Sequence, residues 1–234
     1  MSGLLLAELH RLRAFAPPAP AAAVDASATE EVAEQWGAFA RLGGAAVART
    51  TAFFALQAFM PVYLLRHHEA TAATAGAALT AMLAAGAAGT LLGGWCADRY
   101  GGRRVLVAAM GPLIVALALL PHVGLVAFFA LLVGVGLAVD APFSTTIVLG
   151  QQYLPRRIAL SSGVTYGLAI GVGGLAATAL GALADATSIA LVLGILPLFA
   201  VIALGLAASL PRPADAPAAA CPRPSWPARR GRLA

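Results

Sequence analysis

The sequence contains no lysine and few charged residues of any kind. Only 11% of its 234 residues are Asp, Glu, Lys or Arg, and all 15 basic residues are arginine. So little charge is not typical of a water-soluble domain. No basic patch with interleaved aromatic residues occurs, so a nucleic-acid partner has little support. The two cysteines, Cys96 and Cys221, are too few for a disulfide framework.

Motifs of enzymes and metal sites are also missing. The sequence has no nucleophile-elbow serine, no HExxH and no glycine loop of the phosphate-binding type. His67, His68 and Glu69 stand together, but without a further cluster of ligands we interpret them as solvated loop residues. We therefore expect a protein that is not an enzyme, with no catalytic residues, no metal and no cofactor.

Apolar residues are abundant, at 60% of the chain with a mean hydropathy of +0.85. A chain this apolar needs lipid as its solvent, and a helix needs about 20 apolar residues to cross a bilayer. Six runs of about this length predict an all-α polytopic membrane protein with six transmembrane helices. The predicted spans are residues 42–65, 72–97, 105–121, 124–149, 158–184 and 189–210.

Composition divides the chain into three parts. We interpret residues 1–41 as a cytoplasmic lead-in segment, 42–210 as the transmembrane bundle and 211–234 as a disordered cytoplasmic tail. If both termini are cytoplasmic, thirteen of the 15 arginines lie on the cytoplasmic side, Arg66 lies outside and Arg49 lies within a span. This excess of arginine on the cytoplasmic side agrees with the positive-inside rule. We therefore expect a multi-pass protein of the cytoplasmic (inner) cell membrane.

The clearest motif is the polar turn between the second and third spans, residues 94–104, which reads GWCADRYGGRR. Gly94 would let two helices approach closely, Asp98 would offer a carboxylate to a neighbouring helix N-terminus, and Gly101 would permit a tight reversal. The arginines of this turn are Arg99, Arg103 and Arg104. They would hold the turn in the cytoplasm and pair with the turn's carboxylate or with lipid phosphate.

This turn resembles the signature loop of the major facilitator superfamily of secondary transporters. The segments PVYL (61–64), FSTTIVLGQQYLP (143–155) and SSG (161–163) are similar to the second half of fosmidomycin-resistance-type efflux proteins. The resemblance implies proton-coupled efflux of a small molecule or drug by an antiporter. Such transporters have twelve spans, so it also implies a C-terminal half that works with a second six-helix half or as a homodimer. The alternative is a non-transporting remnant or accessory membrane subunit.

An internal repeat agrees with the resemblance. A shift of 87 positions places residues 74–98 on 161–185 and aligns glycines of the two segments. Because three spans separate the copies, they would run in opposite directions, as in a 3+3 inverted repeat. Chance agreement between two Ala/Gly-rich helices is the alternative. The small residues for which we predict a role in helix packing are Gly86, Gly163, Gly167 and Gly171.

Two charged residues lie within spans, where a charge is energetically costly and therefore indicates a partner or a function. Arg49 and Asp140 lie roughly 10 and 15 Å deep at 1.5 Å per residue, so they can pair. Helical spacing places Asp140, Ser144 and Gln151 on one stripe. We interpret Asp140 as a group that titrates or pairs with Arg49 during transport; alternatively, Arg49 snorkels and Asp140 has only a structural role. The weaker candidates for the substrate or proton pathway are Gln57, Thr145 and Tyr166.

Overall fold

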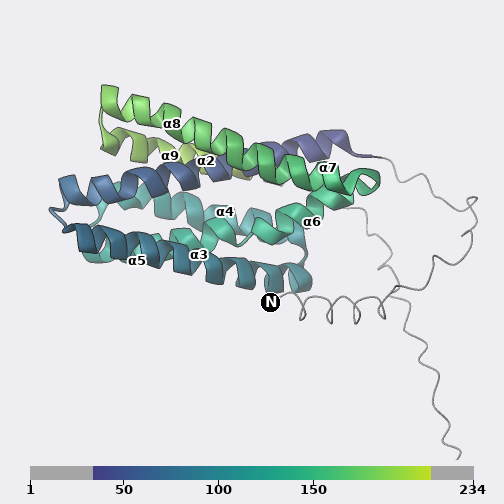
Figure 1. The fold of residues 1–234 in the computed structure, drawn as a ribbon. Coiled ribbons are helices and arrows are strands. Elements are labelled where there is room, and N and C mark those ends of the chain that lie inside the picture. The colour runs from purple at the N-terminus through teal and green to yellow at the C-terminus, as the bar shows by residue number, and fades with distance from the viewer. Residues whose placement is uncertain (1–33, 212–234) are drawn as a thin grey trace, which may run out of the picture. The chain divides into compact units, whose positions relative to one another are not determined.

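A computed structural model describes residues 34–211, which are helical and contain no strand (Figure 1). The predictions made for residues 1–33 and 212–234 lie outside the described residues. The α-helices are α2 (Trp36–His67), α3 (Ala72–Tyr100), α4 (Gly102–Leu119), α5 (Leu125–Asp140), α6 (Phe143–Tyr153), α7 (Ile158–Gly163), α8 (Ala169–Ala186) and α9 (Ile189–Ala208). Short 3-10 turns, η1 (Leu120–His122) and η2 (Pro155–Arg157), and one π-helical turn, η3 (Val164–Leu168), join some of them.

These elements form six segments that are long and apolar enough to cross a membrane, which confirms the predicted spans. The first helix starts at Trp36, earlier than the predicted start of the bundle. Its first turns are helical because Ala38 and Phe39 pack in a small apolar cluster with Leu149 and Tyr153 of α6. The last residues of the predicted lead-in segment therefore belong to the first helix.

The six spans form the predicted 3+3 inverted repeat, but the contacts shared by the two halves lie 90 positions apart and not 87 as in the sequence alignment. In Figure 1, α2 runs between α8 and α9 on one side and α3, α4 and α5 on the other. The Tyr63 hydroxyl, at the end of the first span, donates to the carbonyl of Pro121 at the end of the third (3.2 Å). The Tyr153 hydroxyl, at the end of the fourth, donates to that of Pro211, just after the sixth (3.1 Å). Both bonds join residues 58 positions apart, so each half is tied by the same contact.

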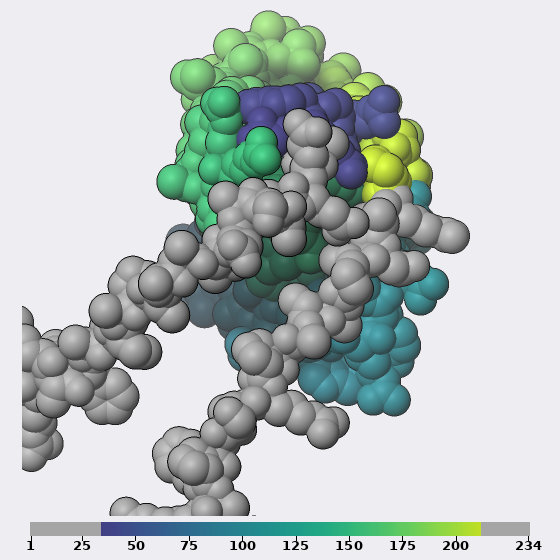
Figure 2. Space-filling model, turned by 90° about the vertical axis from the view of Figure 1, so that its right-hand side faces the viewer, coloured from purple at the N-terminus to yellow at the C-terminus, as the bar shows by residue number. Residues whose placement is uncertain are grey.

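Two arginines hold one end of the bundle together by capping α9. Arg41 donates to the carbonyl of Ser209 (3.2 Å), and Arg103 donates to those of Leu210 (2.8 Å) and Ala208 (2.6 Å). The last carbonyls of a helix have no partner within it, and a guanidinium satisfies them well. The start of α2, the turn between α3 and α4 and the end of α9 therefore meet at one end, which Figure 2 views.

Glycines bring α3 and α5 into close contact. A Cβ atom at Gly89 or Gly93 would overlap the backbone of Leu137 or Ala141, and one at Gly136 would overlap the Met82 carbonyl. A close approach is predicted for Gly94, but an added Cβ there would make only an ordinary contact with the Ser144 hydroxyl (3.6 Å). Small residues at these crossings allow backbone contact where no hydrophobic force drives association.

The predicted packing role of three other glycines is not seen in residues 34–211. A Cβ atom at Gly163, Gly167 or Gly171 would meet nothing within 4 Å. The reason is the direction in which the fifth span packs: α8 contacts α2 through Gly173, whose Cβ would press on Thr50. The glycine face of α7 to α8 is left uncovered by the described helices.

Candidate functional site

The fourth predicted span is broken in its middle. Helix α5 ends at Asp140, a turn follows at Ala141 and Pro142, and α6 starts at Phe143. Proline lacks a backbone N–H and its ring clashes with the preceding turn, so a helix interrupted at this position is expected. The break places Asp140 at a helix end. The single polar stripe for Asp140, Ser144 and Gln151 stays a prediction; Asp140 and Ser144 both lie against glycines of α3, at Gly86 and Gly94.

Three predicted polar residues follow the break, and each has its own surroundings. The Ser144 hydroxyl is buried beside Gly94 of α3, with no hydrogen-bond partner in the described part of the chain. The Gln151 side chain donates to the Ser162 hydroxyl (3.0 Å). Thr145 is buried against the start of α4. None of these three predicted residues lines the cavity described below.

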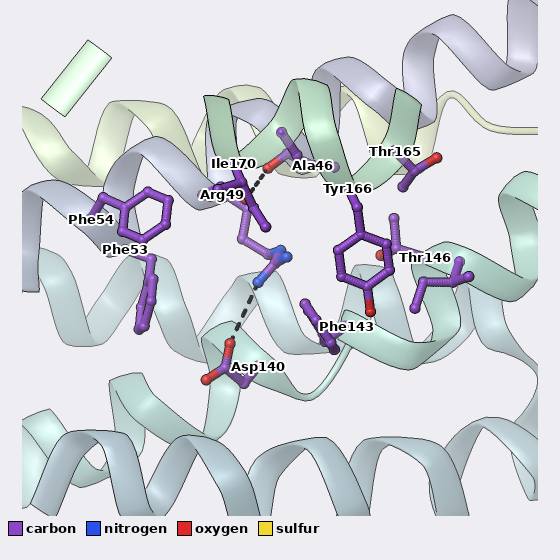
Figure 3. Close-up of a pocket in the computed structure, with 13 residues that line it drawn as sticks. Ala46, Arg49, Phe53, Phe54, Asp140, Phe143, Thr146, Thr165, Tyr166 and Ile170 are labelled. Carbon is purple, nitrogen blue, oxygen red and sulfur yellow. Dashed lines mark hydrogen bonds and ion pairs between the residues drawn. The ribbon is translucent and has the colours of Figure 1, made fainter. Parts of the chain in front are cut away.

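Arg49 and Asp140 do lie together. Arg49 Nη1 is 3.8 Å from Asp140 Oδ1 (Figure 3). The same nitrogen donates to the carbonyl of Val139. This carbonyl is available because the last carbonyls of α5 have no partners within the helix. The Arg49 side chain is only 8% exposed and that of Asp140 is 23% exposed, so the guanidinium does not snorkel to the surface. Arg49 Nε is buried without a partner in residues 34–211.

The other oxygen of Asp140 packs on the α3 backbone at Gly86. A Cβ atom at this position would overlap Asp140 Oδ2, so only glycine leaves room for the carboxylate as it stands. The residue was predicted as a packing glycine, and its contact here is with an ionisable side chain. Gly86 thereby sets the position of Asp140 relative to Arg49.

A cavity of about 210 Å³ opens beside the Arg49–Asp140 pair (Figure 3). Most of its wall is apolar, and the rings of Phe143 and Tyr166 meet edge to face at 5.1 Å. The lining residues are Ala46, Arg49, Thr50, Phe53, Phe54, Asp140, Phe143, Thr146, Ile147, Thr165, Tyr166, Ala169 and Ile170. An apolar wall with a few convergent polar groups is typical of a site for a small organic molecule.

Tyr166 reaches this cavity from a π-helical turn. Helix α7 passes through η3 before α8 begins, and such a turn re-aims the side chains within it. The prediction that Tyr166 shares a site with Asp140 and Arg49 agrees with this geometry. Gln57, two turns beyond Arg49 on α2, does not line the cavity.

The threonines of the cavity differ in what they can offer a bound molecule. The hydroxyls of Thr50 and Thr146 each donate to the backbone carbonyl four residues earlier, both at 2.7 Å. Thr165 Oγ1 is buried without a partner in residues 34–211, so it remains available to donate. Sequence reasoning had not selected the threonines or the aromatic wall of Phe53, Phe54 and Phe143. The sequence indicated this wall only weakly, because Phe53 follows Arg49 by one helical turn and therefore lies on the same face of its helix.

The signature loop has a mainly structural geometry. Gly101 has φ +88°, which permits the reversal between α3 and α4 that the sequence predicted. Arg103 caps α9, and Arg99 lies 6.0 Å from the centre of the Trp95 ring. Asp98 is exposed and forms no ion pair within residues 34–211, so its predicted pairing is not seen there.

The adjacent histidines pack on aromatic rings. The rings of His67 and His68 lie 4.5 and 5.7 Å from that of Tyr63, and His68 also contacts Phe128. In the part of the chain that the structure describes, no three His, Cys, Asp or Glu side chains come together as a metal site would need.

Residues 42–231 match a family model described as Major Facilitator Superfamily. The uncharacterized MFS-type transporter YfnC of Bacillus subtilis (strain 168) is 34% identical over 151 residues, which are 62% of this chain and 36% of that protein. The fosmidomycin resistance protein of Escherichia coli (strain K12) is 34% identical over 154 residues, 64% of this chain and 38% of that protein. The matched segment thus spans little more than a third of either relative.

Proposed function

Since the chain belongs to the major facilitator superfamily, a family of membrane transporters and not of enzymes, we propose that it exports a small molecule in exchange for protons. The observation that carries this proposal is the Arg49–Asp140 pair at the wall of a mostly apolar cavity. Charges within a membrane protein are costly, and they mark substrate and proton pathways. Asp140 is the proposed proton carrier, and Arg49 is the proposed contact for a polar or anionic group of the substrate.

Exchange follows from the loose geometry of the pair. At 3.8 Å the two side chains attract each other without a direct hydrogen bond. With Asp140 deprotonated, its carboxylate accepts a hydrogen bond from a donor group of the substrate, while Arg49, held by the Val139 carbonyl, contacts a polar or anionic group. A proton that enters from outside binds the carboxylate, removes this contact and favours release of the substrate on that side. When the proton leaves toward the cytoplasm, the carboxylate is free for the next substrate, so the proton and the substrate occupy the site in turn.

The chain is proposed to act as a C-terminal half. Alternating access by rocking requires two bundles around one site. Two observations support this: the matched segment spans 36% and 38% of the relatives, and the glycine face of α7 to α8 is uncovered by the described helices. The partner is a second six-helix half or a second copy. If neither restores transport, the accessory or remnant function applies.

Orientation is proposed from charge. The end of the bundle that holds Arg41 and Arg103 is the cytoplasmic end by the positive-inside rule, whereas Arg66 lies at the other end of α2. Both chain termini would then face the cytoplasm of an inner membrane. The name of the Escherichia coli relative supports an antibiotic as the substrate, with fosmidomycin as the first probe.

The proposal is tested by drug susceptibility in an efflux-deficient host. The chain is expressed alone, and then together with a six-helix half taken from the unmatched part of the Escherichia coli relative. The Asp140→Asn variant is compared with Asp185→Asn, which changes an exposed carboxylate outside the cavity. Resistance that Asp140→Asn removes and Asp185→Asn keeps supports the proposal. Verified membrane insertion without resistance in either expression would exclude transport in favour of the accessory function.

A further inference from the structure

A second hollow lies on the bundle between α3, α4 and α5, apart from the cavity at Arg49. It has a volume of about 630 Å³, within the range of roughly 300–1,000 Å³ typical of ligand sites. Its wall is mostly apolar and contains several small residues, among them Ala108, Ala109 and Ala138. At Gly134 an added Cβ would meet nothing within 4 Å, so the hollow stays open at that position. We propose that this groove binds one acyl chain of a phospholipid whose phosphate is held by Arg104.

The length of the groove fits one leaflet of a bilayer. Arg104 marks one end, and Pro112 lies eight residues further along α4, which is about 12 Å at 1.5 Å per residue. Half of the ~30 Å hydrocarbon core is about 15 Å. On the facing helix, the wall runs over a similar distance from Ala141 to Gly134. A chain lying in the groove would therefore start at the polar turn and end near the middle of the membrane.

The charge at the polar end fits a phosphate. Arg104 is exposed and forms no ion pair or hydrogen bond with any other residue of the described part, whereas Arg103 is occupied by the carbonyls of α9. No carboxylate lines the groove, and Tyr100 stands beside Arg104 in its wall. A guanidinium binds a phosphate through two parallel hydrogen bonds, to which the tyrosine hydroxyl can add a third.

The apolar end fits an acyl chain and no polar ligand. Water in this hollow would find few polar partners, because the lining residues other than Arg104 and Tyr100 are alanine, valine, leucine, glycine, proline and one cysteine, Cys96, whose thiol is only a weak hydrogen-bonding group. The six apolar spans place the molecule in lipid, which supplies acyl chains at every lipid-facing surface. Charge complementarity at one end and apolar lining at the other select a phospholipid over a free anion.

Photocrosslinking of the full chain in lipid nanodiscs tests this inference, and it does not require the protein to be active in transport. The nanodiscs contain a small fraction of phosphatidylglycerol with a photoreactive group in its acyl chain, and crosslinked residues are mapped by mass spectrometry. We expect labelling concentrated on residues 105–112 and 134–141, above that of the lipid-facing surface of α9. Arg104→Gln removes one charge-assisted contact with the phosphate. It should lower the ratio of groove labelling to α9 labelling by about tenfold.

Variants of the groove separate a bound lipid from general lipid contact. Gly134→Leu should fill the hollow and abolish the preferential labelling. The controls are Gly111→Leu, where an added Cβ also meets nothing within 4 Å but which does not line the groove, and Arg66→Gln. Both controls should label like the native chain. Labelling equal to that of α9 in the native chain would overturn the proposal, as would preferential labelling kept in Arg104→Gln or in Gly134→Leu. Arg104→Gln alone decides the test if Gly134→Leu does not fold.

Discussion

Asp140 Oδ1 lies 3.8 Å from Arg49 Nη1, which holds the two charges together without a direct hydrogen bond. Arg49 is anchored separately by the Val139 carbonyl, so loss of the Asp140 charge would not displace it. The pair therefore has a fixed cation and a carboxylate that is partly exposed to the cavity. This asymmetry is what assigns the proton to Asp140 and the substrate contact to Arg49 in the proposed exchange.

Asp140→Asn should leave the bundle folded and abolish proton-driven movement. Asparagine has nearly the same shape and keeps the contact with Gly86, but it cannot take up and release a proton. Uptake driven by a pH gradient into vesicles measures the effect, with Asp185→Asn as the matched control. Unchanged transport in Asp140→Asn would remove this residue from the mechanism.

Arg49→Gln should destabilise the protein more than Asp140→Asn does. It leaves the Asp140 carboxylate without its cation, which costs about 1–3 kcal/mol for a partly buried group. Thermal unfolding in detergent compares the two single variants and the double variant. The double variant should be less destabilised than the sum of the singles. Strict additivity of the two changes would contradict a coupled pair.

Gly86→Ala should change the pH dependence of transport, whereas the control variant Gly76→Ala should not. The added methyl would occupy the place of Asp140 Oδ2 and push the carboxylate away from its present position. Gly76→Ala makes the same change on α3 where an added Cβ meets nothing within 4 Å. We expect the pH dependence of transport to shift in Gly86→Ala and to stay native in Gly76→Ala. If both variants keep the native profile, Gly86 does not position Asp140.

Gly101→Ala should destabilise the turn between α3 and α4. A residue with a side chain at φ +88° costs about 1–3 kcal/mol in backbone strain. Gly111→Ala is the control, because that glycine is within a helix and open to its surroundings. The melting temperature of Gly101→Ala should fall while that of Gly111→Ala should not. Equal melting temperatures would mean that the turn carries no strain.

Much of this fold could be predicted because long apolar runs and the duplication are properties of the sequence itself. Arg49 and Asp140 could be paired from their depth alone, since few charges are available within the spans. The break at Pro142 was missed because a proline in a transmembrane helix is often accommodated without interruption. Ser144 and Gln151, which follow this break, do not line the cavity.

Other features depend on tertiary contacts that no local pattern encodes. The capping of α9 by Arg103 joins residues more than a hundred positions apart, whereas the local pattern predicted only a general role for this arginine in the loop. The choice of Gly89 and Gly93, and not Gly94, for close packing depends on how α3 is rotated against α5. The aromatic wall of the cavity likewise forms only when α2, α6 and α8 come together.

The most direct test of the proposed exchange is fosmidomycin efflux from vesicles that contain the chain and a second six-helix half. A pH gradient is imposed, and drug movement is followed in the native protein and in Asp140→Asn. The account predicts gradient-dependent efflux by the native pair and none by the variant. Equal efflux by both would contradict the central role of Asp140, and no efflux by the correctly inserted native pair would contradict fosmidomycin export.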